Sequence, residues 1–206
     1  MRSNKELLNI SKVDFSGRQP EEQPVEIKRF SQEAREALEK QGYIIYGLTG
    51  ASIKSQREAG RPFRTPLLAD HTGFTALQSM QSEVSINPDK LFLPESNNRT
   101  LAKQEEMVDK FSQELNEKVP GVKAIIGQAP DYVELSFQHF DATKDRLFGE
   151  KYGYNYTRTK TPTDDTYVAG VGGFEVLNGL NIGRWAPDGF ISRGISLYVV
   201  PLVVPV

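Results

Sequence analysis

The spacing of apolar positions predicts helices in the first part of the chain. Residues 31–41 carry an apolar stripe at helical spacing, with Ser31 as a candidate N-cap and Gly42 as a stop signal. The clearest helix is expected at residues 100–118, before a Pro-Gly pair. Its apolar face is formed by Leu101, Val108, Phe111 and Leu115.

Beyond this helix the pattern changes to that of strands. Residues 122–126 are apolar, and residues 133–138 alternate with period two, which predicts a strand joined to its predecessor through a turn at 127–130. The pair Asn178-Gly179 between two apolar runs is typical of a β-hairpin turn. A further strand is expected at 195–200.

This order of elements predicts an α+β fold. We expect two or three helices packed on a mixed, mainly antiparallel sheet, with a strand-only C-terminal half after residue 118. Residues 1–25 include a polar, proline-flanked stretch and are expected to form an N-terminal arm and linker. Residues 26–206 have the length of a single domain.

The C-terminal run, residues 197–206, is the longest apolar stretch. It is ten residues long, whereas a membrane-spanning helix needs about 20 apolar residues, so no membrane partner is expected. Pro201 and Pro205 cannot donate ladder hydrogen bonds, which predicts an edge strand or an irregular tail. An exposed apolar edge could pair with a protein partner.

Composition narrows the classes of function. The net charge is −2, from 25 basic and 27 acidic residues, so any polyanion would have to bind a local patch. The chain contains no cysteine, which excludes disulfides, thiolate metal sites and cysteine nucleophiles. This composition fits a cytoplasmic location, and the N-terminus lacks the apolar core of a signal peptide.

Strict motifs for cofactor chemistry are missing from the sequence. There is no P-loop, no His-Glu-x-x-His zinc motif and no Gly-x-Ser-x-Gly nucleophile elbow. The run Gly170-Val-Gly172-Gly173 lacks the third glycine and the following helix of a dinucleotide fingerprint. We expect these glycines at turns or close-packing positions, and we expect neither a cofactor nor a metal.

The most specific functional feature is the segment 151–160. If it is a strand, one face combines aromatic rings with cationic groups, which suits stacking on bases beside phosphates. The chain would then be a binding or interaction module that contacts single-stranded nucleic acid. The alternative is that the tyrosines, which favour strands, cover an edge of the core. The face consists of Tyr152, Tyr154, Tyr156, Arg158 and Lys160.

Histidines beside carboxylates support a second hypothesis. His139 precedes Asp141 by two residues, and Asp70 adjoins His71. A histidine with a nearby carboxylate is the minimum for acid–base catalysis, so the alternative function is an acid–base hydrolase. The competing interpretation of His139 is a hydrogen-bonded structural residue near the end of a strand.

The turn at residues 47–52 is a third candidate. It leads from a predicted strand into a predicted helix and carries the hydroxyls of Thr49 and Ser52. Free N–H groups and hydroxyls at a helix start could hold a phosphate or a carboxylate. The alternative is ordinary helix capping.

Overall fold

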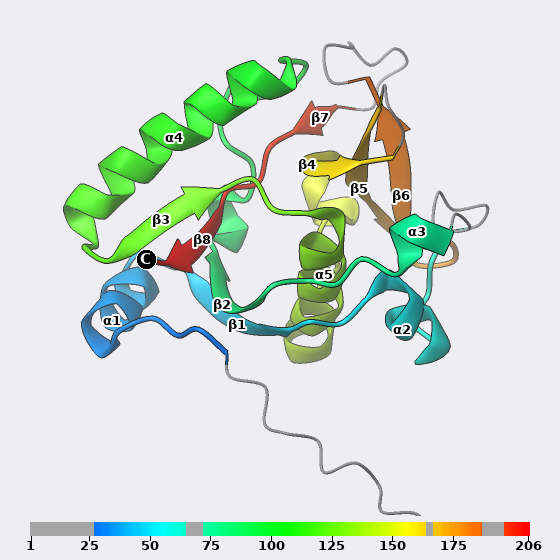
Figure 1. Cartoon of the computed structure of the whole chain (residues 1–206), viewed down its shortest axis with the longest axis horizontal. Helices are drawn as coiled ribbons and strands as arrows, with labels where there is room; N and C mark the ends of the chain where they lie inside the picture. The colour runs from blue at the N-terminus through cyan, green and yellow to red at the C-terminus, as the bar shows by residue number, and fades with distance from the viewer. Residues whose placement is uncertain (1–26, 65–71, 164–166, 187–195) are drawn as a thin grey trace, which may run out of the picture.

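Two small sheets stand on either side of a central helix, α5 (Figure 1). The computed structural model describes residues 27–64, 72–163, 167–186 and 196–206. The α+β class is confirmed, although the strands divide between two sheets. In this described part, no helix is both long and apolar enough to cross a membrane.

The first sheet has the strand order β1-β2-β8-β3, and every pairing in it is antiparallel. Its strands are β1 (Ile44–Thr49), β2 (Gln81–Ile86), β8 (Leu202–Pro205) and β3 (Val122–Ile125). The C-terminal strand β8 is therefore an interior strand. It joins elements that are far apart in the sequence.

The prediction of an edge strand or irregular tail for the C-terminal run is wrong. Val203 lies opposite Ser85 on one side and Ala124 on the other, and it is fully buried. The two prolines do not break the ladder, because Pro201 precedes β8 and Pro205 is its last residue. The residues between them keep their N–H groups and can pair on both sides.

Two helices cover the first sheet much as the apolar stripes predict. They are α1 (Gln32–Lys40) and α4 (Leu101–Lys118), which runs along β3 (Figure 1). The Ser31 hydroxyl accepts a hydrogen bond from the Ala34 N–H at 3.1 Å, which confirms the predicted N-cap. The core beneath these helices contains Phe30, Leu38, Leu115, Val119, Val122 and Val203.

The second sheet has the order β6-β5-β4-β7, in which only the β4–β7 pairing is parallel. Its strands are β4 (Tyr156–Pro162), β5 (Val168–Glu175), β6 (Gly179–Trp185) and β7 (Leu197–Tyr198). The predicted hairpin joins β5 to β6. Its loop has three residues rather than two, and Gly179 follows it with φ of 78°.

Short elements connect the larger ones. α2 (Ile53–Glu58) and α3 (Thr72–Thr75) lie between β1 and β2 in the sequence. The 3-10 turns η2 (Pro88–Lys90) and η3 (Glu150–Tyr152) follow β2 and α5, respectively.

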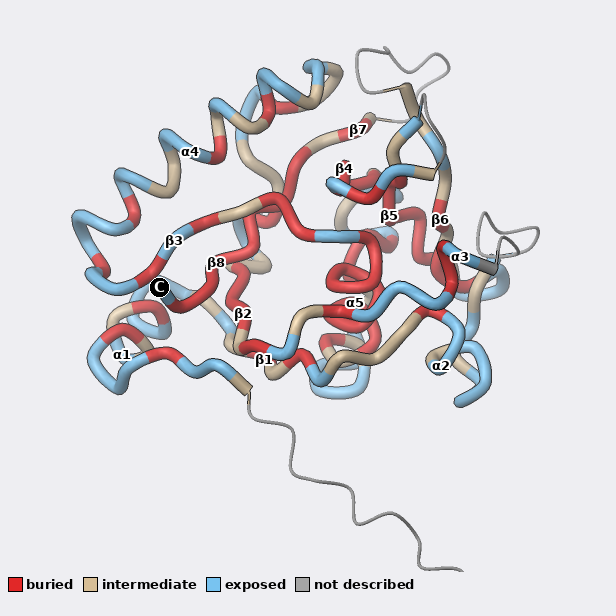
Figure 2. Tube along the Cα trace, viewed as in Figure 1, coloured by how far each residue is buried: buried red, intermediate tan, exposed pale blue. Residues whose placement is uncertain are grey.

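The predicted strand and turn at residues 127–138 are wrong, because this segment forms helix α5 (Ala129–Thr143). Pro130 lies in its first turn and Asp131 forms a capping box with Gln128. Nearly every residue of its first half is buried, polar and apolar alike (Figure 2). A helix that is buried on all sides has no single apolar stripe, so its sequence lacks the usual helical periodicity. The alternation at residues 133–138 therefore indicated a strand. After Thr143 the described residues form the 3-10 turn η3 and strands, so the α-helical part extends beyond the predicted limit at residue 118.

Glycines of β5 permit close packing, as the sequence predicts. A Cβ atom at Gly172 would lie 2.5 Å from the Tyr156 Cα of the neighbouring strand. One at Gly170 would lie 2.5 Å from the Trp185 ring. These positions tolerate no side chain without movement of backbone or ring.

We expect Gly172→Ala to lower the free energy of unfolding by about 1–3 kcal/mol, since the added methyl collides with backbone. Gly73→Ala is the matched control, because nothing lies within 4 Å of its Cβ position. That variant should change stability by less than about 1 kcal/mol. Urea denaturation of both proteins measures the difference, and equal stabilities would contradict the close packing.

Candidate functional site

The five residues of the predicted aromatic–basic face do not share one strand. Strand β4 begins only at Tyr156, whereas Tyr152 ends the 3-10 turn η3. Tyr154 lies between them with φ of 53°, a conformation that breaks the alternation of an extended chain. The prediction of a continuous strand over 151–160 is therefore wrong.

Two members of the predicted face belong to the interior. Arg158 has no exposed surface, and its guanidinium donates hydrogen bonds to the carbonyls of Ala186 at 3.0 Å and Arg99 at 3.2 Å. Tyr156 is also buried, with its ring centroid 4.8 Å from that of Trp185. These two residues therefore match the alternative interpretation of the segment, in which its side chains pack at an edge of the core.

The other three members lie at the surface. Lys160 is exposed and pairs with Glu105 at 2.9 Å. Tyr154 is exposed, and Tyr152 is half-buried. The part of the face that can meet a ligand is thus centred on η3 and not on β4.

His139 lies inside the molecule with Tyr46 as its partner. Its Nδ1 is 2.6 Å from the Tyr46 hydroxyl, and only 2% of its surface is exposed. Asp141 does not pair with His139, because its carboxylate accepts from the Arg61 guanidinium at 2.8 Å. On a helix, residues two apart point in different directions. Asp70 and His71 lie outside the described residues.

The electrostatics of this pair favour neutral groups. Burial lowers the pKa of His139 below its usual 6.5, and Lys151 acts in the same direction while Asp145 opposes it. Burial also raises the pKa of Tyr46 to about 12. The His139 Nε2 has no hydrogen-bond partner within the described part of the chain. A hydrolase using His139 would need a carboxylate bonded to this histidine and access for a substrate. Among the described residues no carboxylate is bonded to His139, and the side chain is buried.

A surface hollow of about 410 Å³ lies beside η2 and η3. Lys151 Nζ lies 3.8 Å from the Asp89 carboxylate and 5.5 Å from the centre of the Tyr152 ring. Phe92 meets the Tyr152 ring edge-on at 6.5 Å. Burial raises the pKa of Tyr152, which keeps the phenol neutral at pH 7. The residues that line the hollow include Asp89, Lys90, Phe92, Lys151 and Tyr152.

The sequence made Tyr152 a candidate, whereas Lys90 and Phe92, which line the same hollow, were not among its candidates. About sixty positions separate η2 from η3, and only the fold brings them together. The signal that was available is local: a lysine and a phenylalanine lie two residues apart after a Pro-containing turn. Such a pair is too common to indicate a site by itself.

The turn at residues 47–52, which was predicted to bind an anion, is hydrogen-bonded to the Glu134 side chain. Glu134 accepts hydrogen bonds from the Thr49 N–H at 3.0 Å and the Thr49 hydroxyl at 2.7 Å. The Ser79 hydroxyl and the Gln138 amide also donate to this carboxylate. The Ser52 hydroxyl caps α2 by accepting from the Ser55 N–H. The donors of the turn are therefore occupied within the fold.

A second buried carboxylate lies one turn earlier on α5. Asp131 accepts from the Met80 N–H at 2.8 Å and the Gln128 N–H at 2.6 Å. Burial raises the pKa of Asp131, and these two hydrogen bonds oppose that effect. In the described ranges, no group of three or more histidines and carboxylates is arranged to hold a metal ion.

We expect Arg158→Ala to lower the free energy of unfolding by about 2–4 kcal/mol, because it leaves two carbonyls without their donor and opens a cavity. Lys160→Ala removes an exposed ion pair and should cost less than about 1 kcal/mol. Urea denaturation of the two variants makes the comparison. Similar small losses would mean that Arg158 is accessible after all.

The buried histidine predicts a pH dependence of stability. Because the folded pKa of His139 lies below the unfolded value of about 6.5, the unfolded chain binds the proton more tightly. The stabilising contribution is complete above pH 6.5 and is lost as the pH falls through the folded pKa. The free energy of unfolding should fall more between about pH 7.5 and 5.5 in the wild type than in His139→Gln. Parallel pH profiles would contradict this.

No protein-family model matches the chain, and comparison with curated proteins and with solved structures gave no significant match. The comparisons therefore transfer no role to any residue. The chemistry of the described residues is the remaining basis for a function.

Proposed function

We propose that the chain is a binding module for a nucleotide unit, and that the hollow between η2 and η3 is its site. The observation that carries this proposal is the pairing of two aromatic rings with two lysines in one hollow. In this arrangement the base stacks on Tyr152, while Phe92, whose ring stacks on Tyr198 at 4.7 Å, supports the Tyr152 ring at its edge. The phosphate lies at Lys90 and Lys151.

The size of the hollow supports a small planar ligand. Its volume of about 410 Å³ falls within the usual range for ligand pockets, about 300–1,000 Å³. Tyr152 and Phe92 are half-buried, so each ring is fixed by packing while part of it faces outward. Stacking of a base on an aromatic side chain contributes about 1–3 kcal/mol and tolerates any base.

The charges around the hollow support an anionic group on the ligand. Lys90 is exposed and forms no ion pair with a described residue. Lys151 has Asp89 as a partner at 3.8 Å, but both side chains are more than half exposed, and such pairs are weak. A phosphate can therefore attract both ammonium groups at little cost to the fold.

The binding-module hypothesis is kept, but its site moves from a strand at residues 151–160 to the hollow between η2 and η3. Tyr152 remains the central aromatic residue, whereas Tyr156 and Arg158 serve the core. The buried His139 supplies no comparable support for hydrolysis. The cytoplasmic location expected from the cysteine-free composition is part of the proposal.

A fluorescence anisotropy titration with labelled oligothymidine at low salt tests the site. Tyr152→Ala should weaken binding about tenfold through the loss of stacking, whereas Tyr152→Phe keeps the ring and should bind normally. Lys151→Ala should weaken binding. It should also reduce the slope of the logarithm of the affinity against the logarithm of the salt concentration by the amount expected for about one phosphate contact. Lys54→Ala is the matched control, because Lys54 is an exposed lysine paired with Glu58 on α2.

Urea denaturation of each variant separates loss of binding from loss of folding. Absence of saturable binding by the wild type would overturn the proposed function. So would an equal loss in Lys54→Ala, because it would show a general attraction to positive charge and not a site.

A further inference from the structure

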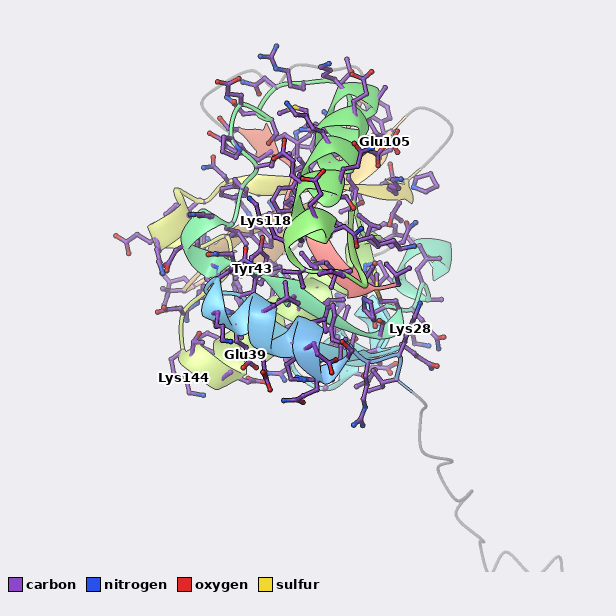
Figure 3. The ribbon with its side chains drawn as sticks, turned by 90° about the vertical axis from the view of Figure 1, so that its left-hand side faces the viewer. Lys28, Glu39, Tyr43, Glu105, Lys118 and Lys144 are labelled. Atoms are coloured by element: carbon purple, nitrogen blue, oxygen red, sulfur yellow. The ribbon has the colours of Figure 1, made fainter. Side chains whose placement is uncertain are left out.

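A second hollow, of about 310 Å³, opens on the other side of η2. It lies between the C-terminal ends of α1 and α4, on the face where Figure 3 labels Tyr43 and Lys118. The Asn87 side chain donates to the Gln41 carbonyl at 2.9 Å and so fixes η2 against the end of α1. The residues of this hollow used below are Gln41, Tyr43, Asn87, Lys90, Phe111 and Lys118.

The second hollow repeats the chemistry of the first. It combines the half-buried rings of Tyr43 and Phe111 with the ammonium groups of Lys90 and Lys118. Burial raises the pKa of Tyr43 above its ordinary value, as it does for Tyr152. Lys90 lines both hollows and is thus the residue that they share.

The charge on this side also favours an anion. Glu114 is the acidic residue of the second hollow, and its carboxylate lies 3.9 Å from Lys110 on the same helix. Lys118 forms no ion pair with a described residue. Lys118 and Lys90 are thus the lysines of this hollow that form no ion pair with a described residue, and both can meet a phosphate.

We propose that the two hollows are adjacent subsites for consecutive units of a single-stranded nucleic acid, with Lys90 at the phosphate between them. This inference rests on the proposed function, since it requires that the first hollow binds a nucleotide unit. It adds that the ligand is a polymer. A free mononucleotide fills one subsite only and leaves Tyr43, Phe111 and Lys118 without a role in its binding.

Comparison of thymidine monophosphate with an oligothymidine of about eight residues tests the inference. Two variants of the second hollow, Tyr43→Ala and Lys118→Ala, should each weaken oligothymidine binding about five- to tenfold and leave binding of the mononucleotide unchanged. Lys90→Ala should weaken both ligands. Tyr43→Phe keeps the ring, and Lys103→Ala removes another exposed lysine of α4, which pairs with Glu106 away from both hollows, so both controls should bind the oligomer normally.

The outcomes separate the two proposals. If Tyr152→Ala weakens both ligands while Tyr43→Ala and Lys118→Ala weaken neither, the first hollow binds nucleotides alone and the two-subsite inference is wrong. If the second-hollow variants weaken the mononucleotide as much as the oligomer, the inference also fails, because the hollows would not be separate subsites. If the wild type binds neither ligand, the proposed function and the two-subsite inference both fail. Urea denaturation confirms that each variant is folded before its affinity is compared.

Discussion

The fold depends on the hydrogen bonds that the buried carboxylates of α5 accept from the first sheet and its loops. Glu134 is almost fully buried and accepts from Thr49 and Ser79, while Asp131 accepts from the N–H of Met80. A buried carboxylate without such donors would cost several kcal/mol, so α5 is stable in this place only while those loops keep their shape. The start of the helix is bonded to the second sheet as well, through the hydroxyl of Thr161. One helix therefore joins the two sheets.

The position of α5 also places the proposed site. The chain that leaves the helix is held by Phe148, which is buried, accepts a hydrogen bond from Phe174 of β5 at its carbonyl and packs beside the Phe92 ring. This attachment brings η3 against η2, and Tyr152, Lys151 and Lys90 line one hollow. The aromatic and basic side chains of the hollow thus lie on short turns whose ends are fixed by packed residues. Such a supported surface can bind a ligand without ordering a long segment.

The polar residues of the interior and those at the surface around η2 differ in their partners. Inside the protein, Glu134 and Arg158 are surrounded by partners and His139 is held by Tyr46, which are arrangements expected of structural groups. At the surface around η2, Lys90 and Lys118 lie beside half-buried rings and form no ion pair with a described residue. The exposed ammonium groups and the outward parts of these rings are the groups that a ligand can contact, and they support the binding proposal.

Local features were determined by the sequence alone: the N-capped helix α1, the helix α4 and the hairpin at Gly179. Each depends on neighbouring residues or on one exposed and one buried face, which periodicity records. Helix α5, the interior place of β8 and the meeting of η2 with η3 were decided only by the tertiary structure. Enclosure on all sides removes the amphipathic pattern, and contacts between distant segments leave no periodic trace. For that reason the sequence identified Tyr152 as a candidate, and the fold alone supplied its companions.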